Sequence, residues 1–488
     1  MRRIDAHCQH NAGQLLDLVS ELLRILVRRD GVQVDNAVDA IVVVLDFGPV
    51  FQRAQVISDV RTAGRLDSGE NSFLHLSDRG TSIVNEAPGR EAVVTIEKWV
   101  YGGAGLARID GRVVLAPFTL PGEKVRIADA GVHAKLLEVI EPASERVVAP
   151  CPVFGRCGGC HYQHAPYDLQ LTAKRAILVE ELRRIGKIDP PDTVDVVASE
   201  PWGYRNRTQL HIAGGRLGYR EARSHKLCAI ESCPVSSPKL NQTINVLVEM
   251  LRDPRWPRFV RTLEIFTDEK HVQLNVLDSA QPVARRFFDW CAERIAGFVP
   301  GALDYQGRFR VSGNSFFQVN RFLLERLVET ALEHREGETA LELYAGVGLF
   351  SLALGDRFRE VASVESGSAA MSDLEFNLER AGRSNVSAIK GTSEEHLERL
   401  DRAPDFILLD PPRAGVGQRV VNRLNILRPR TLTMVSCDPA TLARDLSGLV
   451  ASGYSIEKVT LIDLFPQTYH LETVVQLRLK DLINGQTS

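Results

Sequence analysis

The last third of the chain alternates apolar strands with helices, and this rhythm constrains the fold more than any other feature. From Thr339 onward, an apolar strand leads into a glycine-rich turn and a helix, a second strand ends in an acid, and a third ends in Asp-Pro-Pro. Strands that alternate with helices at this spacing form a parallel sheet with both faces covered. The pattern therefore predicts an α/β domain, to which we assign residues 331–488.

Three features of these strands predict a nucleotide-like site at the carboxyl edge of the sheet. Gly346 and Gly348 follow the first strand, where glycine lets a ligand approach the backbone closely. Glu365 ends the second strand, where its carboxylate can accept hydrogen bonds from both ribose hydroxyls, and Asp410 ends the third. The Lys-Ser/Thr pair of triphosphate sites and the third glycine of dinucleotide sites are missing from the sequence motif. The set resembles the S-adenosylmethionine site of Rossmann-like methyltransferases, although turns, a helix cap and a strand end would explain each piece alone.

A single cysteine suggests covalent chemistry at the same edge. Cys437 follows another apolar strand, whereas Arg413 stands after Asp-Pro-Pro, where methyltransferases that act on amino groups tend to carry an aromatic ring. Carbon 5 of a pyrimidine is a weak nucleophile, so a thiolate must first add to carbon 6. A base must then remove the carbon 5 proton. Glu472 is the leading candidate for that base and His470 its rival, while an inert buried thiol is the structural alternative for Cys437.

A second group of cysteines predicts a metal site. Cys151, Cys157 and Cys160 fall close together, and such clustering in a cytosolic chain indicates metal binding or catalysis rather than disulfides. A four-thiolate site needs one more ligand, for which Cys233 is the leading candidate and Cys228 the rival. Zinc and an iron–sulfur cluster both accept such a set, and the spacing does not decide between them.

The segments before the last third predict other structures. Short strands with Gly and Pro turns predict a small β-barrel or sandwich over residues 89–148, and mixed strand and helix signals follow over 149–330. The central part carries a run of arginines that, taken alone, is best explained as a solvated face: Arg205, Arg207, Arg216 and Arg220. Since the formal net charge is -3, any binding of nucleic acid must be local. The apolar runs are far shorter than the ~20 residues of a membrane span, so we expect a soluble cytoplasmic protein.

Taken together, the motifs resemble those of the RNA uridine carbon-5 methyltransferases that carry an N-terminal TRAM domain and a [4Fe-4S] cluster. The resemblance covers about residues 90–480. The matching segments stand in the family order at 101–108, 120–125, 157–174, 314–320, 410–413 and 436–445. The resemblance implies an OB-like TRAM barrel, a central α+β domain with a four-cysteine cluster, and a Rossmann-like methyltransferase domain.

The resemblance also implies roles for individual residues. Cys437 would be the nucleophile, Glu472 the base, and Asp410 a carboxylate that touches the uracil edge or the methyl donor. The S-adenosylmethionine site would comprise Gln318, Tyr344, Gly346, Gly348, Glu365, Thr392 and Asp410, and the [4Fe-4S] cluster would be held by Cys151, Cys157, Cys160 and Cys233. Two positions depart from the usual pattern, because Asp438 and Leu349 stand where family members often have Asn.

The function that follows is methylation of uridine carbon 5 in RNA, with 23S ribosomal RNA favoured over transfer RNA. On this interpretation the four arginines line a phosphate path, and the target base leaves its stack to reach Cys437. The alternatives are a transfer-RNA uracil-5-methyltransferase, an RNA cytosine-5-methyltransferase and a non-catalytic iron–sulfur RNA-binding protein. We expect no membrane association and no obligate protein partner. We expect residues 1–88 to be an extension of unknown role, either disordered or read from a misplaced start.

Overall fold

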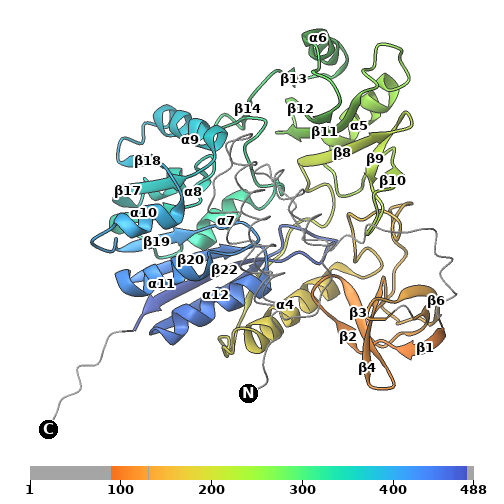
Figure 1. The fold of residues 1–488 in the computed structure, drawn as a ribbon, viewed down its shortest axis with the longest axis horizontal. Helices are drawn as coiled ribbons and strands as arrows, with labels where there is room; N and C mark the ends of the chain where they lie inside the picture. The colour runs from red at the N-terminus through yellow and green to blue at the C-terminus, as the bar shows by residue number, and fades with distance from the viewer. Residues whose placement is uncertain (1–89, 130, 481–488) are drawn as a thin grey trace, which may run out of the picture. The chain divides into compact units, whose positions relative to one another are not determined.

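A computed structural model of the chain describes residues 90–129 and 131–480 (Figure 1). The extension expected over residues 1–88 lies outside the described residues. No helix within the described ranges is both long and apolar enough to cross a bilayer.

The first described segment is rich in β-structure. It forms two three-stranded antiparallel sheets, in the orders β1-β5-β6 and β2-β3-β4. Their strands are β1 (Glu91–Thr95), β2 (Lys98–Trp99), β3 (Ala104–Ile109), β4 (Arg112–Pro117), β5 (Lys124–Ala128) and β6 (Lys135–Glu141). Alternate residues such as Val94, Val114 and Ile127 point into a shared apolar core. The strands expected in this part of the sequence are therefore present.

The central part begins with helix α4 (Tyr167–Arg184) and continues into a six-stranded sheet in the order β10-β9-β8-β11-β12-β13. The strands of this sheet are β8 (Arg207–Ala213), β9 (Arg216–Arg220), β10 (Leu227–Ala229), β11 (Val260–Thr267), β12 (Val272–Ser279) and β13 (Phe298–Val299). Helices α5 (Pro238–Met250) and α6 (Arg285–Arg294) contribute side chains to the same apolar core as the sheet. A hairpin, β14 (Leu303–Tyr305) with β15 (Phe309–Val311), leads into the last part of the chain.

The last part is built on an eight-stranded sheet in the order β18-β17-β16-β19-β20-β22-β21-β7 (Figure 1). The first five strands in that order are mutually parallel, whereas β22 runs antiparallel to both of its neighbours. The strands are β7 (Asp195–Val197), β16 (Gly337–Leu343), β17 (Phe358–Glu365), β18 (Val386–Lys390), β19 (Phe406–Leu409), β20 (Thr431–Ser436), β21 (Tyr454–Ile462) and β22 (Glu472–Leu479). Strand β7 comes from the stretch 149–330, so that stretch also contributes to the eight-stranded sheet.

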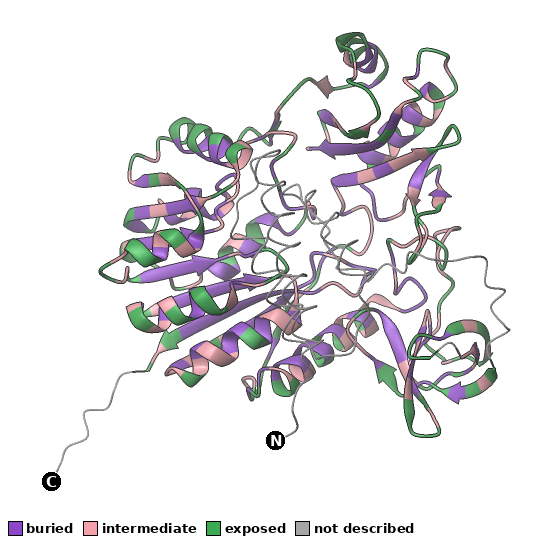
Figure 2. Cartoon of the chain, viewed as in Figure 1, coloured by how far each residue is buried: buried purple, intermediate pink, exposed green. Residues whose placement is uncertain are grey.

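Helices cover both faces of this sheet, as the alternation of strands and helices predicts. On β19, Ile407 and Leu409 belong to one core and Phe406 and Leu408 to the other, because successive strand residues point to opposite faces. Figure 2 shows the resulting pattern, with buried strands and helices exposed on one side only. The first core includes α4, α10 (Ser393–Arg399), α11 (Gly417–Leu427) and α12 (Pro439–Ala451), and the second includes α7 (Leu324–Ala331), α8 (Leu349–Leu354) and α9 (Ser368–Arg380).

Candidate active site

The pairing of β20 with β22 brings Cys437 and Glu472 to the same end of the sheet. Ser436 pairs with Thr473 in the antiparallel register, so the next positions along the two strands are Cys437 and Glu472. Asp410 follows β19, which is the other neighbour of β20. Each of these acids acts electrostatically on Cys437 and opposes its ionisation. The structure thus gathers the three residues that the sequence placed at separate strand ends.

Burial dominates the electrostatics of this group. The Glu472 side chain is only 3% exposed, and burial together with the charge of Asp410 raises its pKa well above the ordinary value. Burial also raises the pKa of Asp410. Arg413 is the nearby cation that acts in the opposite direction on Glu472. When one of the two acids is protonated, Asp410, Glu472 and Arg413 together carry a net charge near zero.

The thiol of Cys437 is neutral in this surrounding. Burial, and then the charge of Glu472, raise its pKa to about 12, while Arg413 lowers it. Next to the thiol, Asp438 begins α12 as its N-cap, and its Oδ1 accepts hydrogen bonds from the backbone N–H groups of Ala440 and Thr441. Such a cap fixes the orientation of a side chain at a helix N-terminus. The site therefore holds a shielded thiol that becomes a nucleophile only when its proton leaves.

The glycine turn after β16 has the geometry of a ligand-binding loop. Gly346 and Gly348 have φ angles of 58° and 93°, in the left-handed region that favours glycine. The Gly346 N–H donates to Oε2 of Glu365 at 2.9 Å, and the Gly367 N–H donates to Oε1 of the same residue. A side chain at Gly348 would collide with Leu374, 2.7 Å from the position of its Cβ. Glu365 thus ties the turn to the end of β17.

The other expected donor-site residues lie in different environments. Gln318 is buried, and Tyr344 is partly buried with a positive φ of 65°. Thr392 is exposed and is the N-cap of α10, where its hydroxyl accepts a hydrogen bond from the Glu395 N–H at 3.2 Å. The side chain at position 392 is therefore engaged in holding a helix start.

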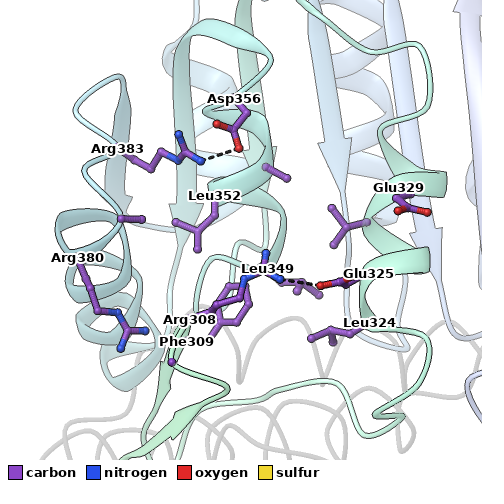
Figure 3. Close-up of a pocket in the computed structure, with 14 residues that line it drawn as sticks. Arg308, Phe309, Leu324, Glu325, Glu329, Leu349, Leu352, Asp356, Arg380 and Arg383 are labelled. Atoms are coloured by element: carbon purple, nitrogen blue, oxygen red, sulfur yellow. Dashed lines mark hydrogen bonds and ion pairs between the residues drawn. The ribbon is translucent and has the colours of Figure 1, made fainter.

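Leu349, which departs from the family pattern, lies in a cavity of about 380 Å³ at the start of α8 (Figure 3). Helices α7, α8 and α9 contribute most of its lining, and Cys437, Asp410 and Glu472 are not among the lining residues. Its charges are paired, because Arg383 lies 2.6 Å from Asp356 and Arg308 lies 2.9 Å from Glu325. The cavity is therefore separate from the candidate chemistry.

Glu342 is a buried acid in the donor region that the sequence did not single out. It lies on β16, where the hydroxyls of Ser351 and Ser363 both donate to its Oε2. Burial raises its pKa to about 8, and the charges of Asp410 and Glu365 act in the same direction. The signal in the sequence is an acid between two leucines, at the end of the strand that the structure buries.

The four expected cluster cysteines surround one small cavity. Cys151, Cys157, Cys160 and Cys233 all line a space of about 50 Å³, and all are free thiols. Cys228 does not line it and instead accepts a hydrogen bond from Arg156. Burial raises the pKa of Cys157 and of Cys160 to about 12. Among the described residues, however, the side chains do not converge into a group of three or more that could hold a metal ion.

The segment between β21 and β22 leads into Glu472 and is held by residues of the central part. Lys174 donates to Asp463 at 2.6 Å and to the Phe465 carbonyl at 3.0 Å. Gln170 exchanges hydrogen bonds with Gln467 through its side chain. Further bonds to the segment come from the backbone N–H of His161 and from the side chains of Tyr167, Tyr204 and Asn320. Several residues that the sequence matched without a role thus position the loop before the candidate base.

The arginines expected along an RNA path separate into two kinds. Arg207 is buried and donates to Glu264 and to the Ser315 carbonyl at 2.7 and 2.6 Å. Arg205 lines the cysteine cavity. Arg216 and Arg220 lie exposed on β9. Arg207 is therefore engaged inside the fold, whereas a phosphate path along these arginines stays a prediction.

Comparisons with known proteins show the family of the chain. The family model described as tRNA (Uracil-5-)-methyltransferase matches residues 298–480. An uncharacterized RNA methyltransferase of Aquifex aeolicus is 31% identical over 435 residues, which cover 80% of this chain and 98% of the relative. A similar protein of Thermotoga maritima is 30% identical over 439 residues, with 79% and 98% covered. The crystal structure of the Pyrococcus abyssi tRNA (uracil-54, C5)-methyltransferase with S-adenosyl-L-homocysteine has a TM-score of 0.60 and 26% identity, covering 79% of this chain and 100% of that one.

Proposed function

Because the chain belongs to the RNA (uracil-5-)-methyltransferase family, we propose that it methylates carbon 5 of a uridine in RNA through a covalent intermediate on Cys437. The observation that carries the proposal is the register of β20 and β22, which sets Cys437 opposite Glu472. A nucleophile and a base on facing strand ends can act on the same pyrimidine ring.

The residues of the site divide the reaction into steps. The Cys437 thiolate forms a bond to carbon 6, and the displaced electron pair becomes an enolate that makes carbon 5 nucleophilic. Once carbon 5 carries the methyl group, Glu472 takes the carbon 5 proton, the double bond re-forms, and the bond to sulfur breaks. Arg413 favours the ionised form of both Cys437 and Glu472. Asp410, whose pKa burial raises, can remain protonated and donate a hydrogen bond to the uracil edge.

The methyl donor fits the turn after β16. When bound, S-adenosylmethionine supplies an electrophilic methyl group. The positive-φ glycines leave the backbone of the turn open to a ligand, and Glu365 lies at the end of the adjacent strand. Tyr344 and Gln318 complete the proposed donor site with Asp410. Thr392 contributes to it through the cap of α10.

We propose that the cysteine cavity holds a [4Fe-4S] cluster. Four thiols around one cavity match the donor set that such a cluster requires, and Cys228 lies outside this set. The cluster would hold the segment 157–164, whose backbone donates from His161 and Tyr162 to the Gln467 carbonyl. The role of the cluster would therefore be to fix the position of the segment 157–164.

Variants of two cysteines test the cluster. Anaerobically purified protein with Cys233→Ser should lose iron, acid-labile sulfide and visible absorbance, whereas Cys228→Ser should retain all three. Equal loss in the two variants would contradict the ligand set, and full retention by Cys233→Ser would remove Cys233 from it. Zinc in place of iron in the wild-type protein would show that a different metal is bound.

The β1–β6 segment is proposed to be a TRAM barrel that grips looped RNA. Arg216 and Arg220 remain as candidates for phosphate contacts because both are exposed. We favour ribosomal RNA as substrate because the joint presence of the barrel and the cysteine set resembles the ribosomal branch of the family. Transfer RNA is the second candidate, since the Pyrococcus abyssi structure is named as a transfer-RNA enzyme.

Tritium release tests the proposed function. Anaerobically purified protein is incubated with S-adenosylmethionine and with ribosomal or transfer RNA that carries tritium at uridine carbon 5. Release to water from one RNA, absent in Cys437→Ala, is the expected result and identifies the substrate class. Release from neither RNA would contradict the proposal, and 5-methylcytidine in the digested product would indicate cytosine methylation instead.

A further inference from the structure

The turn between β2 and β3 reaches from the β-rich segment to the candidate active site. Tyr101 lies in this turn, and its hydroxyl donates to Oδ2 of Asp438 at 3.1 Å. The two residues are 337 positions apart in the chain. The Tyr101 ring also packs edge-on against Tyr469, with 5.5 Å between ring centroids and an interplanar angle of 90°. One side chain thus contacts two segments of the last part of the chain, which carries the candidate active site.

The close approach of the turn is built into its backbone. Gly102 and Gly103 have φ angles of 101° and 85°, which side chains other than glycine rarely adopt. A Cβ at Gly103 would lie 3.0 Å from His161 and 3.1 Å from Tyr469. The turn therefore fits against both of these rings only because it carries no side chain there. This geometry sets where Tyr101 meets the catalytic part.

Both contacts of Tyr101 lead directly to the proposed chemistry. Asp438 follows Cys437 in the chain, and Tyr469 stands three residues before Glu472. The two oxygens of Asp438 have different partners, because Oδ1 caps α12 and Oδ2 accepts from Tyr101. A carboxylate held at both oxygens cannot rotate toward the neighbouring thiol without losing a hydrogen bond.

We propose that Tyr101 is a positioning residue for methyl transfer, which holds the Asp438 carboxylate in place beside Cys437 from the β-rich segment. This role rests on the proposed function of the site. The hydrogen bond from the Tyr101 hydroxyl keeps Oδ2 of Asp438 directed at Tyr101. The ring of Tyr101 packs against Tyr469 and so supports the loop that leads to Glu472. Through this side chain, the segment proposed to grip RNA also helps to assemble the nucleophile.

The charges that surround the thiol support this role. Glu472 on β22, Asp410 after β19 and Asp438 each oppose ionisation of Cys437, and Arg413 favours it. Tyr101 donates a hydrogen bond to Oδ2 of Asp438. Burial and the Asp438 charge raise the pKa of Tyr101 far above its ordinary value, so Tyr101 keeps its proton and remains a donor. Without this donor, the Asp438 charge acts more strongly on the thiol.

A double-mutant cycle tests the proposal. Tyr101→Phe keeps the ring against Tyr469 and removes only the hydroxyl, while Asp438→Asn removes the charge and keeps an oxygen that can cap α12. Tyr101→Phe should lower kcat about fivefold to tenfold, with little change in the KM for RNA. It should also move the pH dependence of Cys437 alkylation by iodoacetamide to higher pH. In the Asp438→Asn background, the same tyrosine change should have almost no effect on either quantity.

Two comparisons make the outcome decisive. Tyr162→Phe is the control, because the Tyr162 hydroxyl is buried with no hydrogen-bond partner in the described part of the chain, and this variant should alkylate like the wild type. Equal effects of Tyr101→Phe with Asp or with Asn at position 438, or a change confined to KM, would overturn the proposal. Alkylation needs no RNA or methyl donor, so a shift in alkylation without any uridine methylation would uphold the role of Tyr101 and contradict only the proposed reaction.

Discussion

Lys174 and Asp463 form a fully buried ion pair, with 2.6 Å between Nζ and Oδ1 and no solvent exposure of either side chain. Tyr167 donates to the other oxygen of the same carboxylate at 2.9 Å. The pair joins helix α4 to the loop that precedes Glu472. The position of the candidate base thus depends on a helix that lies almost 300 residues earlier in the chain.

Removal of the Lys174 charge should destabilise the protein strongly. In Lys174→Met, Asp463 is left buried without its cation, which typically costs about 3–5 kcal/mol. We expect a thermal unfolding midpoint several degrees lower and a reduced kcat, measured by calorimetry and by tritium release. The matched control is Lys98→Met, which breaks an ion pair of the same 2.6 Å length whose side chains are 47% and 40% exposed. Exposed pairs contribute at most ~1 kcal/mol, so equal effects of the two variants would contradict the account.

The pH dependence of turnover should follow the raised pKa values of the site. Burial raises the pKa of Cys437 to about 12 and that of Glu472 well above its usual range, and both groups act in their deprotonated forms. The value of kcat/KM should therefore rise through neutral pH and continue to rise in alkaline solution. Arg413→Gln should shift this rise of kcat/KM to higher pH, because Arg413 lowers both pKa values. A plateau that begins below neutral pH would be incompatible with the buried thiol.

Glu342 should make stability depend on pH. Burial raises its pKa from 4.5 to about 8, so the folded state binds this proton more tightly than the unfolded chain does. The associated stability is complete below about pH 4.5 and is lost as the pH rises through about 8. Glu342→Gln should therefore unfold at a higher temperature than the wild type at alkaline pH and show a flatter dependence on pH. If the unfolding temperatures of Glu342→Gln and the wild type changed with pH in the same way, the Glu342 carboxyl would not be protonated in the folded state.

We expect the exposed arginines to affect RNA binding and the buried Arg207 to affect stability. Arg216→Gln combined with Arg220→Gln should weaken RNA affinity at low salt and reduce the salt dependence of binding by roughly one unit of slope per lost contact. Arg207→Gln should instead lower stability, because it leaves Glu264 buried without its partner. Filter binding across salt concentrations, with thermal unfolding of the same variants, distinguishes the two effects. A stable Arg207→Gln protein with reduced salt dependence would contradict this division.

The sequence predicted the parallel part of the catalytic sheet and the residues at its carboxyl edge, because strand ends and turns carry local signals. Asp410 and Cys437 each follow a recognisable apolar strand, and Glu365 is the last residue of another. The antiparallel pairing of β22 with β20, which brings Glu472 opposite Cys437, has no local signal in the sequence, although the sequence offers Glu472 as the leading candidate for the base.

Other features depend on contacts that no local pattern encodes. Strand β7 joins the catalytic sheet from far upstream, and Tyr101 meets Asp438 across most of the chain. The sequence alone does not show that Arg207 is buried, because its partner Glu264 lies on a different strand, far away in the chain. Such pairs are decided by tertiary packing, which single-sequence patterns do not contain.

Covalent trapping tests the central claim most directly. Glu472→Gln protein is incubated with S-adenosylmethionine and the RNA that releases tritium with wild-type enzyme, and the mixture is run on a denaturing gel. Since the variant can add Cys437 to carbon 6 but cannot remove the carbon 5 proton, a protein–RNA adduct should accumulate, and it should be absent when Cys437→Ala is added to the same chain. Methylated RNA released freely by Glu472→Gln at the normal rate, or an adduct that forms without Cys437, would contradict the account.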